Sequence, residues 1–301
     1  MKQLIELCKK FNCKYLENEK MSLHTTFKIG GNARLVVYPQ NEEQIGEFVK
    51  CAKSEKVRLI AIGNGSNLLV DDGGIDACVL ILGEPFSDIR LIDDETIYAK
   101  AGAKLISLCR FAYEHSLSGL EFAYGIPGSA GGAAFMNAGA YGGEMKDVLY
   151  KCEHIDNDGN VGSLEKDELK LSYRHSVYYD NDCIITGLYL KLKKGERAEI
   201  KAKMDDFIRR RRDKQPLEYP SAGSTFKRPE GYFAGKLIMD AGLRGYTVGG
   251  AQVSEKHCGF VVNKGGATAA DVMQLVNDVK KTVKDSSGVD LELEIKTLGA
   301  F

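Results

Sequence analysis

The pattern of hydrophobic and polar positions predicts short strands alternating with amphipathic helices along most of the chain. In the first part, strands are expected at Arg34–Tyr38 and Val57–Ile62, with a helix between them that runs from Asn41 to about Lys56. The helix begins with a capping-box pattern, Asn41-Glu-Glu-Gln44. Together these elements form a β-α-β-like unit. Further strands are predicted at 68–70, 89–92, 96–101, 149–155, 161–164 and 184–192, and a helix at 104–116.

A change of composition at Lys193–Glu196 separates a second part of the chain. Residues 197–214 have apolar side chains at helical spacing, which predicts an amphipathic helix leading to a boundary at Gln215–Pro216. The pattern indicates at least two domains, divided near residue 200. After the boundary, helices are expected at 233–241 and 268–285, and strands at 259–262 and 289–296, the last with strict alternation.

One segment combines many small residues with almost no charge. Residues 119–143 are rich in glycine and alanine but keep Phe122, Tyr141 and other side chains that can pack. Glycine permits positive φ and close approach of backbone to a neighbour. Because long structureless loops in compact domains are usually functional, we expect an ordered loop wrapped around a bound ligand. A glycine-rich turn system between strands is the alternative.

A second glycine cluster, Gly63-Asn-Gly-Ser-Asn67, follows directly after the strand predicted at 57–62. A strand that ends in such a turn is typical of a backbone nest for phosphate. The cluster is not the usual dinucleotide fingerprint, because Leu68 stands where the third glycine is required. By itself, this motif indicates a phosphate site only weakly.

Composition narrows the class of protein. The chain has 301 residues, of which 44% are hydrophobic and 28% charged, as in ordinary globular proteins of two or three domains. A net charge of -1 gives no field that would attract nucleic acid or an anionic membrane. No apolar run could span a bilayer, and the first residues lack the core of a signal peptide. The eight cysteines form no C-x-x-C pair, which indicates reduced thiols in the cytoplasm and no zinc site.

Eight motifs, taken in order, resemble a single family. From about residue 20 to the C-terminus the chain resembles the UDP-N-acetylenolpyruvoylglucosamine reductase family. It is similar to the shorter subclass, because no insertion carries the substrate-capping tyrosine loop of the longer one. The motifs are Thr25-Thr-Phe-Lys-Ile-Gly-Gly-Asn-Ala33, Gly63–Asn67, Gly125-Ile-Pro-Gly-Ser-Ala-Gly-Gly132, Asn137-Ala-Gly-Ala-Tyr-Gly142, Tyr173-Arg174, Tyr219–Pro229, Gly249-Gly-Ala251 and Leu293-Glu294.

The resemblance implies an α+β fold. Its FAD-binding part is of the vanillyl-alcohol-oxidase/PCMH type in two subdomains, and a C-terminal α+β domain binds the substrate. On this sequence the subdomains are expected at 1–84 and 85–200 and the substrate domain at 201–295. Residues 296–301 are expected to return to the first subdomain.

The resemblance also implies the activity and the cofactors. In this family NADPH reduces FAD, and the flavin gives hydride to the methylene carbon of an enolpyruvyl ether, which completes UDP-N-acetylmuramate for peptidoglycan. We expect FAD to be bound without a covalent link, because all five histidines lie outside the glycine clusters. No separate nicotinamide fingerprint is present, which agrees with a family in which both substrates use one site in turn.

Three residues are expected to be catalytic, because hydride transfer leaves negative charge that must be stabilised and then protonated. The resemblance assigns the proton donor to Ser224, within the predicted tight turn Ser221–Phe226; a turn serine bonded to its own backbone is the alternative. It places Glu294 beside the substrate carboxylate, which would favour the protonated form; a solvated strand residue is the alternative. Arg174 has a planar fork that suits a carboxylate, unless it forms only a surface ion pair.

The remaining expected site residues bind rather than react. Lys227, Arg228 and Lys236 supply positive charge for the substrate diphosphate, and Tyr173 belongs to the same site. His257 either lines that pocket or has a structural role. The FAD contacts are expected at Tyr38, Gly63, Asn64, Gly65, Ser66, Asn67, Gly125, Pro127, Gly128, Ser129, Gly131, Gly132, Asn137, Ala138 and Gly139.

Other features of the sequence bear on alternative functions. The run Arg209–Arg212 could bind nucleic acid, but Asp205 and Asp206 precede it on the predicted helix, so intrahelical ion pairs are expected instead. We expect a monomer that binds neither nucleic acid nor membrane. Another FAD-dependent oxidoreductase of the same superfamily is the first alternative, and a non-catalytic nucleotide-binding protein is the second.

Overall fold

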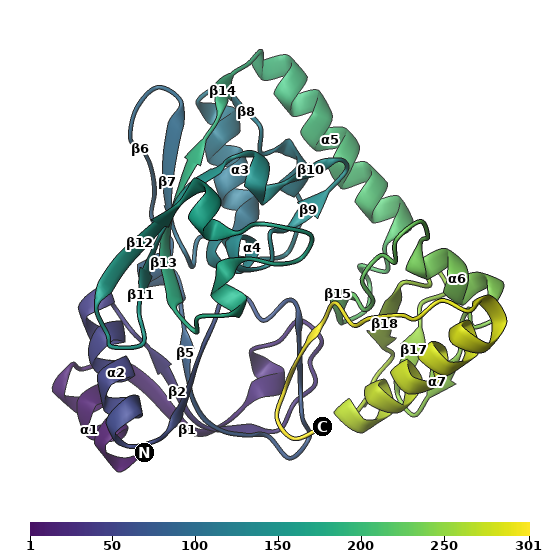
Figure 1. Cartoon of the computed structure of the whole chain (residues 1–301), viewed down its shortest axis with the longest axis horizontal. Coiled ribbons are helices and arrows are strands. Elements are labelled where there is room, and N and C mark those ends of the chain that lie inside the picture. The colour runs from purple at the N-terminus through teal and green to yellow at the C-terminus, as the bar shows by residue number, and fades with distance from the viewer. The chain divides into compact units, whose positions relative to one another are not determined.

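The structure, a computed structural model, describes all 301 residues and divides into two compact units (Figure 1). Unit 1 comprises Met1–Glu17, Leu35–Asn64 and Ala77–Arg210. Unit 2 comprises Asn18–Arg34, Gly65–Asp76 and Arg211–Phe301. Each unit therefore combines segments that are far apart in the sequence.

Seven α-helices carry the hydrophobic faces that cover the sheets. The two longest, α5 and α7, match the amphipathic segments expected near residues 200 and 270. The helices are α1 (Lys2–Lys10), α2 (Glu42–Ser54), α3 (Leu105–Glu114), α4 (Ala130–Phe135), α5 (Arg197–Lys214), α6 (Ala234–Asp240) and α7 (Ala269–Ser287).

A five-stranded antiparallel sheet forms the centre of unit 1. Helix α4 packs against two of its strands, β7 and β13, and the buried side chains between them belong to one hydrophobic core. In spatial order the strands are β12 (Val161–Glu165), β11 (Leu149–Ile155), β13 (Ile184–Lys191), β7 (Thr96–Lys100) and β6 (Ile89–Leu91).

A four-stranded sheet contains the first β-α-β unit. Strands β3 and β5 pair in parallel, with Arg58–Ile62 opposite Ala77–Ile81. Helices α1 and α2 pack against each other, and the rings of Phe11 and Phe48 meet edge to face at 6.3 Å. The spatial order is β1 (Lys14–Lys20), β2 (Asn32–Tyr38), β5 (Ile75–Ile81) and β3 (Arg58–Ile62).

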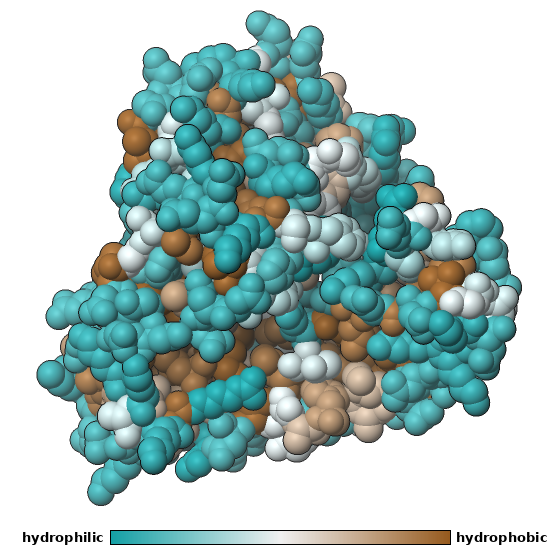
Figure 2. All heavy atoms as spheres, viewed as in Figure 1, coloured by the Kyte–Doolittle hydropathy of each residue, from teal (hydrophilic) through white to brown (hydrophobic).

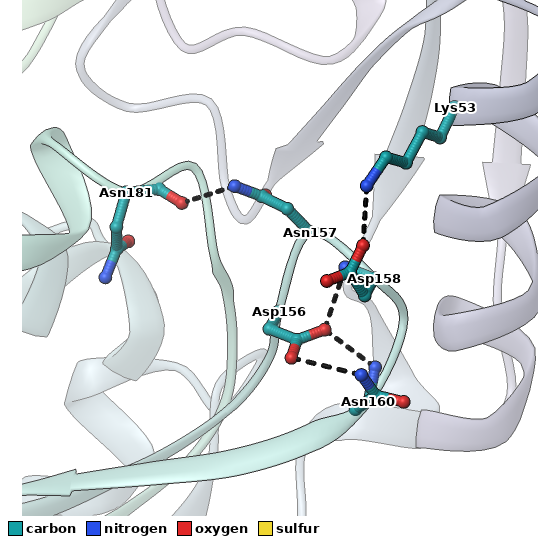
Figure 3. Close-up of polar contacts among 6 residues, drawn as sticks. All are labelled: Lys53, Asp156, Asn157, Asp158, Asn160 and Asn181. Carbon is teal, nitrogen blue, oxygen red and sulfur yellow. Dashed lines mark hydrogen bonds and ion pairs between the residues drawn. The ribbon is translucent and has the colours of Figure 1, made fainter.

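The turn between β11 and β12 is ordered by one carboxylate (Figure 3). Asp156 Oδ1 accepts hydrogen bonds of 2.8 Å from the backbone N–H groups of both Asn160 and Asp158. These bonds, the one from Asn160 first, hold the pKa of Asp156 below its usual value. Asn157 Nδ2 donates to the carbonyl oxygen of Asn181 at 2.9 Å, which ties the turn to a neighbouring loop.

The same turn docks on helix α2. Lys53 Nζ lies 2.5 Å from Asp158 Oδ1 (Figure 3). Gly46 and Gly159 come so close that a Cβ built on Gly46 would lie 2.5 Å from the Gly159 carbonyl oxygen. Because the exposed ion pair contributes little, the glycine contact is the stronger constraint on how the turn and the helix meet.

Unit 2 has its own sheet and core. Helix α7 packs on strands β16 and β17, and α6 packs on α7. A capping box begins α7, in which Thr268 and Asp271 each accept from the other's backbone N–H at 3.0 Å, and Gly288 ends it at φ 74°. The strand order is β15 (Ser221–Ser224), β18 (Phe260–Asn263), β17 (Ala251–Val253) and β16 (Thr247–Val248).

Three pairs of short strands complete the structure. The C-terminal strand β19 (Lys296–Leu298) runs parallel to β4 (Leu68–Val70), so the chain end returns to residues from its first quarter. The other pairs are β8 (Leu117–Ser118) with β14 (Lys193–Lys194) and β9 (Gly139–Ala140) with β10 (Gly143–Glu144).

Most of the predicted elements are present within a residue or two of their expected ends. The ion pairs expected within α5 are confirmed: Arg209 and Arg210 both pair with Asp206, at 2.5 and 2.7 Å. Asn41 caps α2 through the N–H of Gln44, but Gln44 Oε1 accepts from the N–H of Gln40 instead of closing the expected box.

Three segments form a different kind of local structure from the one expected. The glycine-rich segment is not only loop, because Ser129 caps the short helix α4 inside it. The expected turn Ser221–Phe226 is a strand with a bulge, where Gly223 takes φ 78°. Residues 289–296 keep only part of the expected alternation, since Leu291 and Ile295 are buried but Leu293 is half-buried like Glu294. They pair irregularly, with one bridge at Leu293. Strands β1, β5, β8, β9, β10, β14, β15, β16 and β17 were not predicted, and β19 begins where the last expected strand ends.

Polar residues dominate the surface. Figure 2 shows one face on which hydrophilic residues cover most of the area and hydrophobic ones gather near β2. None of the helices combines the length and the apolar composition that crossing a bilayer requires. All eight cysteines are free thiols, and burial raises the pKa of most of them, that of Cys8 to about 12.

Candidate flavin and substrate site

The start of the first glycine cluster, Gly63 and Asn64, meets the second cluster in unit 1. A Cβ built on Gly63 would lie 2.1 Å from Ser129 Oγ, so only glycine allows this approach. Asn64 Nδ2 donates to the carbonyl oxygen of Pro127 at 3.3 Å. The end of β3 is therefore held against the start of α4 by contacts that involve few side-chain atoms.

Backbone donors differ between the two clusters. The N–H groups of Gly63, Asn64 and Ser66 donate to no acceptor in the protein, whereas those of Ala130 and Gly131 are bonded to carbonyl oxygens at 2.8 Å. Unused N–H groups in so short a stretch suit an anion such as a diphosphate. The first cluster therefore offers hydrogen bonds, and the second offers a close surface without bulky side chains.

Gly65 belongs to unit 2 and is fixed there by a close approach. It has φ 58°, and a Cβ at this position would lie 2.0 Å from the carbonyl oxygen of His24. Its own carbonyl oxygen accepts from the N–H of Thr26 at 3.2 Å. The expected nest thus contains a glycine that no other residue could replace without displacing backbone.

Asn137 was expected to contact FAD, but its side chain is committed within the protein. It is fully buried, and its Nδ2 donates to Glu144 Oε2 and to the Ser172 carbonyl oxygen, both at 2.9 Å. Its Oδ1 accepts from the N–H of Lys146 at 2.8 Å. The side chain joins the end of the glycine-rich segment to the loop at Ser172, so its contribution to the site is positional.

Arg174 lies in that loop. Ser172 and His175 close a tight turn with two backbone hydrogen bonds of 3.1 Å, and Arg174 adopts φ 55°, a conformation uncommon outside glycine. Its Nη2 donates to the Gly139 carbonyl oxygen at 3.4 Å. The guanidinium lies 5.1 Å from the ring centroid of Tyr173, which is 49% exposed. Arg174 is half-buried and held by the glycine-rich segment.

Ser224 sits at the end of the bulged strand in unit 2. It is half-buried, and its hydroxyl forms no hydrogen bond within the protein. In contrast, the neighbouring Thr225 hydroxyl accepts from the N–H of Val261 at 2.9 Å, and Ser221 Oγ accepts from the N–H of Gly223 at 3.5 Å. Ser224 therefore does not show the backbone bond of an ordinary turn serine.

Glu294 lies on the segment next to Ser224. Its N–H donates to the Thr225 carbonyl oxygen at 2.9 Å, and its carbonyl oxygen accepts from Asn67 Nδ2 at 3.1 Å. The alternation of the sequence predicted the face correctly, since Leu291 and Ile295 are buried while Glu294 is half-buried. Ser224 and Glu294, which are 70 positions apart in the sequence, thus lie on hydrogen-bonded backbone segments.

Two lysines belong to this part of unit 2. Lys227 pairs with Glu292 at 3.1 Å, and the Lys227 N–H donates to the Glu292 carbonyl oxygen. Burial, and next the charge of Lys227, lowers the pKa of Lys296. Lys296 was not among the expected site residues, although its place on the same face as Glu294 was the signal that could have found it.

The other expected binding residues are less closely tied to Ser224. Lys236 is exposed and pairs with Asp240 one turn along α6, at 2.8 Å. His257 Nδ1 accepts from the N–H of Gly259 at 3.1 Å, and burial lowers the pKa of this imidazole. In unit 1, the ring of Tyr38 lies under Lys14 Nζ at 4.7 Å.

Known proteins and family models match this chain over most of its length. A family model described as an FAD binding domain matches residues 33–165, and one described as the C-terminal domain of UDP-N-acetylenolpyruvoylglucosamine reductase matches residues 215–298. The UDP-N-acetylenolpyruvoylglucosamine reductase of Agathobacter rectalis is 52% identical over 297 residues, which cover 95% of this chain and 94% of that protein. The chain belongs to the UDP-N-acetylenolpyruvoylglucosamine reductase family. The protein of the same name from Clostridium perfringens strain SM101 is 50% identical over 281 residues, 93% of this chain and 91% of that protein.

Solved structures confirm the family and the fold class. The crystal structure of UDP-N-acetylenolpyruvylglucosamine reductase from Thermus caldophilus has a TM-score of 0.81 at 35% identity, covering 95% of this chain and 99% of that chain. A variant of Physcomitrella patens BBE-like 1 covers 64% of this chain and 44% of that chain with a TM-score of 0.51 and 16% identity. The expected α+β fold of the family, with FAD as its cofactor, is therefore confirmed.

The contact between Gly63 and Ser129 predicts the effect of a methyl group. Gly63→Ala should release FAD, because the new Cβ would displace Ser129 and with it the start of α4. We expect a protein that is folded by circular dichroism but has lost most of its absorbance at the flavin band. Gly83→Ala is the matched control, since nothing lies within 4 Å of a Cβ there. Full flavin content in Gly63→Ala would contradict this role.

Proposed function

We propose that this chain catalyses the NADPH-dependent, FAD-mediated reduction of UDP-N-acetylenolpyruvoylglucosamine to UDP-N-acetylmuramate, a step of peptidoglycan precursor synthesis. The observation that carries the proposal is the pairing of the Ser224 and Glu294 segments beside Lys227 and Lys296. A hydroxyl without a protein partner, a half-buried carboxyl and two cations suit the protonation of an anionic intermediate.

The FAD expected from the family fits the glycine clusters. Gly63, Asn64 and Ser66 have N–H groups available for its diphosphate, and Gly128, Gly131 and Gly132 leave room for it without charged side chains. Such a non-covalently bound FAD would supply the hydride, taken from NADPH, for the methylene carbon of the enolpyruvyl group. Side chains of the protein would donate the proton and stabilise the negative charge.

Ser224 is the proposed proton donor. Hydride addition to the methylene carbon leaves negative charge on the neighbouring carbon, which delocalises into the substrate carboxylate. A serine is a weak acid, but a carbanion is a strong enough base to take its proton when nearby cations stabilise the alkoxide. Lys227 and Lys296 are the cations of unit 2 that suit this role.

Glu294 and Arg174 are proposed to stabilise the charge. A carboxyl beside the substrate carboxylate is driven towards its protonated form, so Glu294 would donate a hydrogen bond to the dianionic intermediate. The guanidinium of Arg174 would pair with the same carboxylate through its planar fork. Tyr173, Lys227, Arg228, Lys236 and His257 remain the proposed binding residues for the rest of the substrate.

We also propose the setting in which the enzyme works. Residues 1–84 and 85–200 are taken as the two FAD subdomains and 201–295 as the substrate domain. Free thiols with raised pKa values support a reducing cytoplasm, and a net charge of -1 supports a protein that binds neither nucleic acid nor an anionic membrane. We propose that the protein is a monomer.

The proposed function is tested by turnover of the yellow holoenzyme. NADPH oxidation should be fast with UDP-N-acetylenolpyruvoylglucosamine and slow without it, and the product should gain two hydrogens by mass. UDP-N-acetylglucosamine, which lacks the enolpyruvyl group, is the control substrate. A protein without flavin, or a flavoprotein whose NADPH oxidation ignores the enolpyruvyl substrate, would contradict the proposal.

Ser224→Ala should separate the two half-reactions. Reduction of the flavin by NADPH should persist, while its reoxidation by the enolpyruvyl substrate should slow by orders of magnitude, since the hydroxyl serves only the second step. Stopped-flow absorbance follows each half separately. Ser221→Ala, in the same strand, is the control. Equal slowing of both halves by Ser224→Ala would indicate a structural serine instead.

Glu294→Gln should slow flavin reoxidation while flavin content and fold survive. Loss of one preorganised donor at a comparable site costs about 10²–10³ in rate. Glu292→Gln is the control, because Glu292 is 73% exposed and surface substitutions usually stay within about 0.5 kcal/mol. Measured side by side by stopped flow, equal behaviour of the two variants would refute the assignment.

A further inference from the structure

Two adjacent aromatic side chains are exposed at the start of α6. Tyr232 is 49% exposed and Phe233 is 59% exposed, although both belong to unit 2 and its core lies directly beyond them at Ala234. Gly231, at φ 74°, turns the chain here, and the Tyr232 N–H donates to the Pro229 carbonyl oxygen at 3.1 Å. The aromatic pair is thus presented by an ordered turn.

Arg228 is held against this pair. Its guanidinium carbon lies 4.0 Å from the ring centroid of Phe233, and its Nε donates to the Tyr232 carbonyl oxygen at 3.2 Å. A cation–π contact at an exposed site accounts for the place of the arginine. The same contact does not explain the exposure of the Phe233 ring, which keeps most of its surface in water.

The aromatic pair is continuous with the Ser224 segment. Gly235, two residues after Phe233, packs against His257 and Gly259, since a Cβ there would lie 3.1 Å from the Gly259 nitrogen. The Gly259 carbonyl oxygen in turn accepts from the N–H of Thr225 at 2.9 Å. The start of α6 and the residue after the proposed proton donor therefore both contact Gly259, just before β18.

We propose that Phe233, supported by Tyr232, is the platform on which the pyrimidine base of the nucleotide substrate stacks. This inference rests on the proposed function for the identity of the nucleotide. In a nucleoside diphosphate the base and the diphosphate are joined through one ribose, so a site for both needs an aromatic plane next to a cation. Arg228 in contact with Phe233 provides that combination, and aromatic rings bind bases by their π faces.

The chemistry of Phe233 limits what this platform can recognise in a base. A phenylalanine ring offers stacking but no hydrogen bond, so Phe233 contributes to affinity for the base and not to the choice between uracil and cytosine. The contribution should appear equally for UDP and CDP and should be absent for inorganic pyrophosphate. These three ligands therefore separate stacking of the base from binding of the phosphates.

Calorimetric titration of the FAD-loaded enzyme with these ligands tests the proposal. Phe233→Ala should weaken UDP and CDP binding about tenfold, the range expected for loss of one stacked base, and leave pyrophosphate binding unchanged. Phe233→Tyr should restore UDP binding. The matched control is Phe301→Ala, because Phe301 is 52% exposed at the chain end and lies outside the proposed site.

Three results would overturn the inference: wild-type affinity of Phe233→Ala for UDP, equal weakening of UDP and pyrophosphate, or no binding of UDP by the wild-type enzyme. Equal weakening would mean that the ring only supports Arg228. Failure of the proposed function would appear differently, as NADPH oxidation that does not depend on UDP-N-acetylenolpyruvoylglucosamine. The titrations do not require turnover, so the two failures can be told apart.

Discussion

The organisation of unit 2 depends on the backbone hydrogen bonds of residues 224–227. This short segment is bonded to 259–261 on one side and to 292–294 on the other, and Thr225 provides bonds to both. Because buried backbone groups must be paired, the register of all three segments is fixed together. Ser224, Glu294 and Lys227 thereby occupy defined places, although no direct contact between their side chains is needed to hold them there.

Unit 1 relies on a different constraint, the absence of side chains. Gly63 lets the end of β3 reach Ser129, and Gly131 lets α4 pack so close to Ala101 that an added Cβ would lie 2.8 Å from the Ala101 Cβ. The buried Asn137 then ties this region to the loop that carries Arg174. The small residues allow the close contacts, and the hydrogen-bonded Asn137 amide helps to position the loop of Arg174. The glycine-rich segment therefore positions residues of the proposed site as well as leaving room for the proposed ligand.

The two units divide the proposed chemistry. In the proposal, the groups for the cofactor diphosphate, Gly63 and Asn64, belong to unit 1, and the proton donor, the carboxyl and the lysines belong to unit 2. Such a division is consistent with a reaction in which hydride and proton come from separate groups.

The sequence by itself determined the family, most helices, about half of the strands, and the polar face that carries Glu294, because these depend on motifs and on local periodicity. Helix α4 escaped prediction because glycine and alanine give no periodic signal, and its cap and packing partners come from distant segments. Tertiary structure alone decided that the Ser224 hydroxyl forms no hydrogen bond within the protein, that the Asn137 side chain is hydrogen-bonded within the protein, and that Lys296 belongs beside Lys227. Each of these depends on pairing between residues far apart in the chain, which local pattern does not encode.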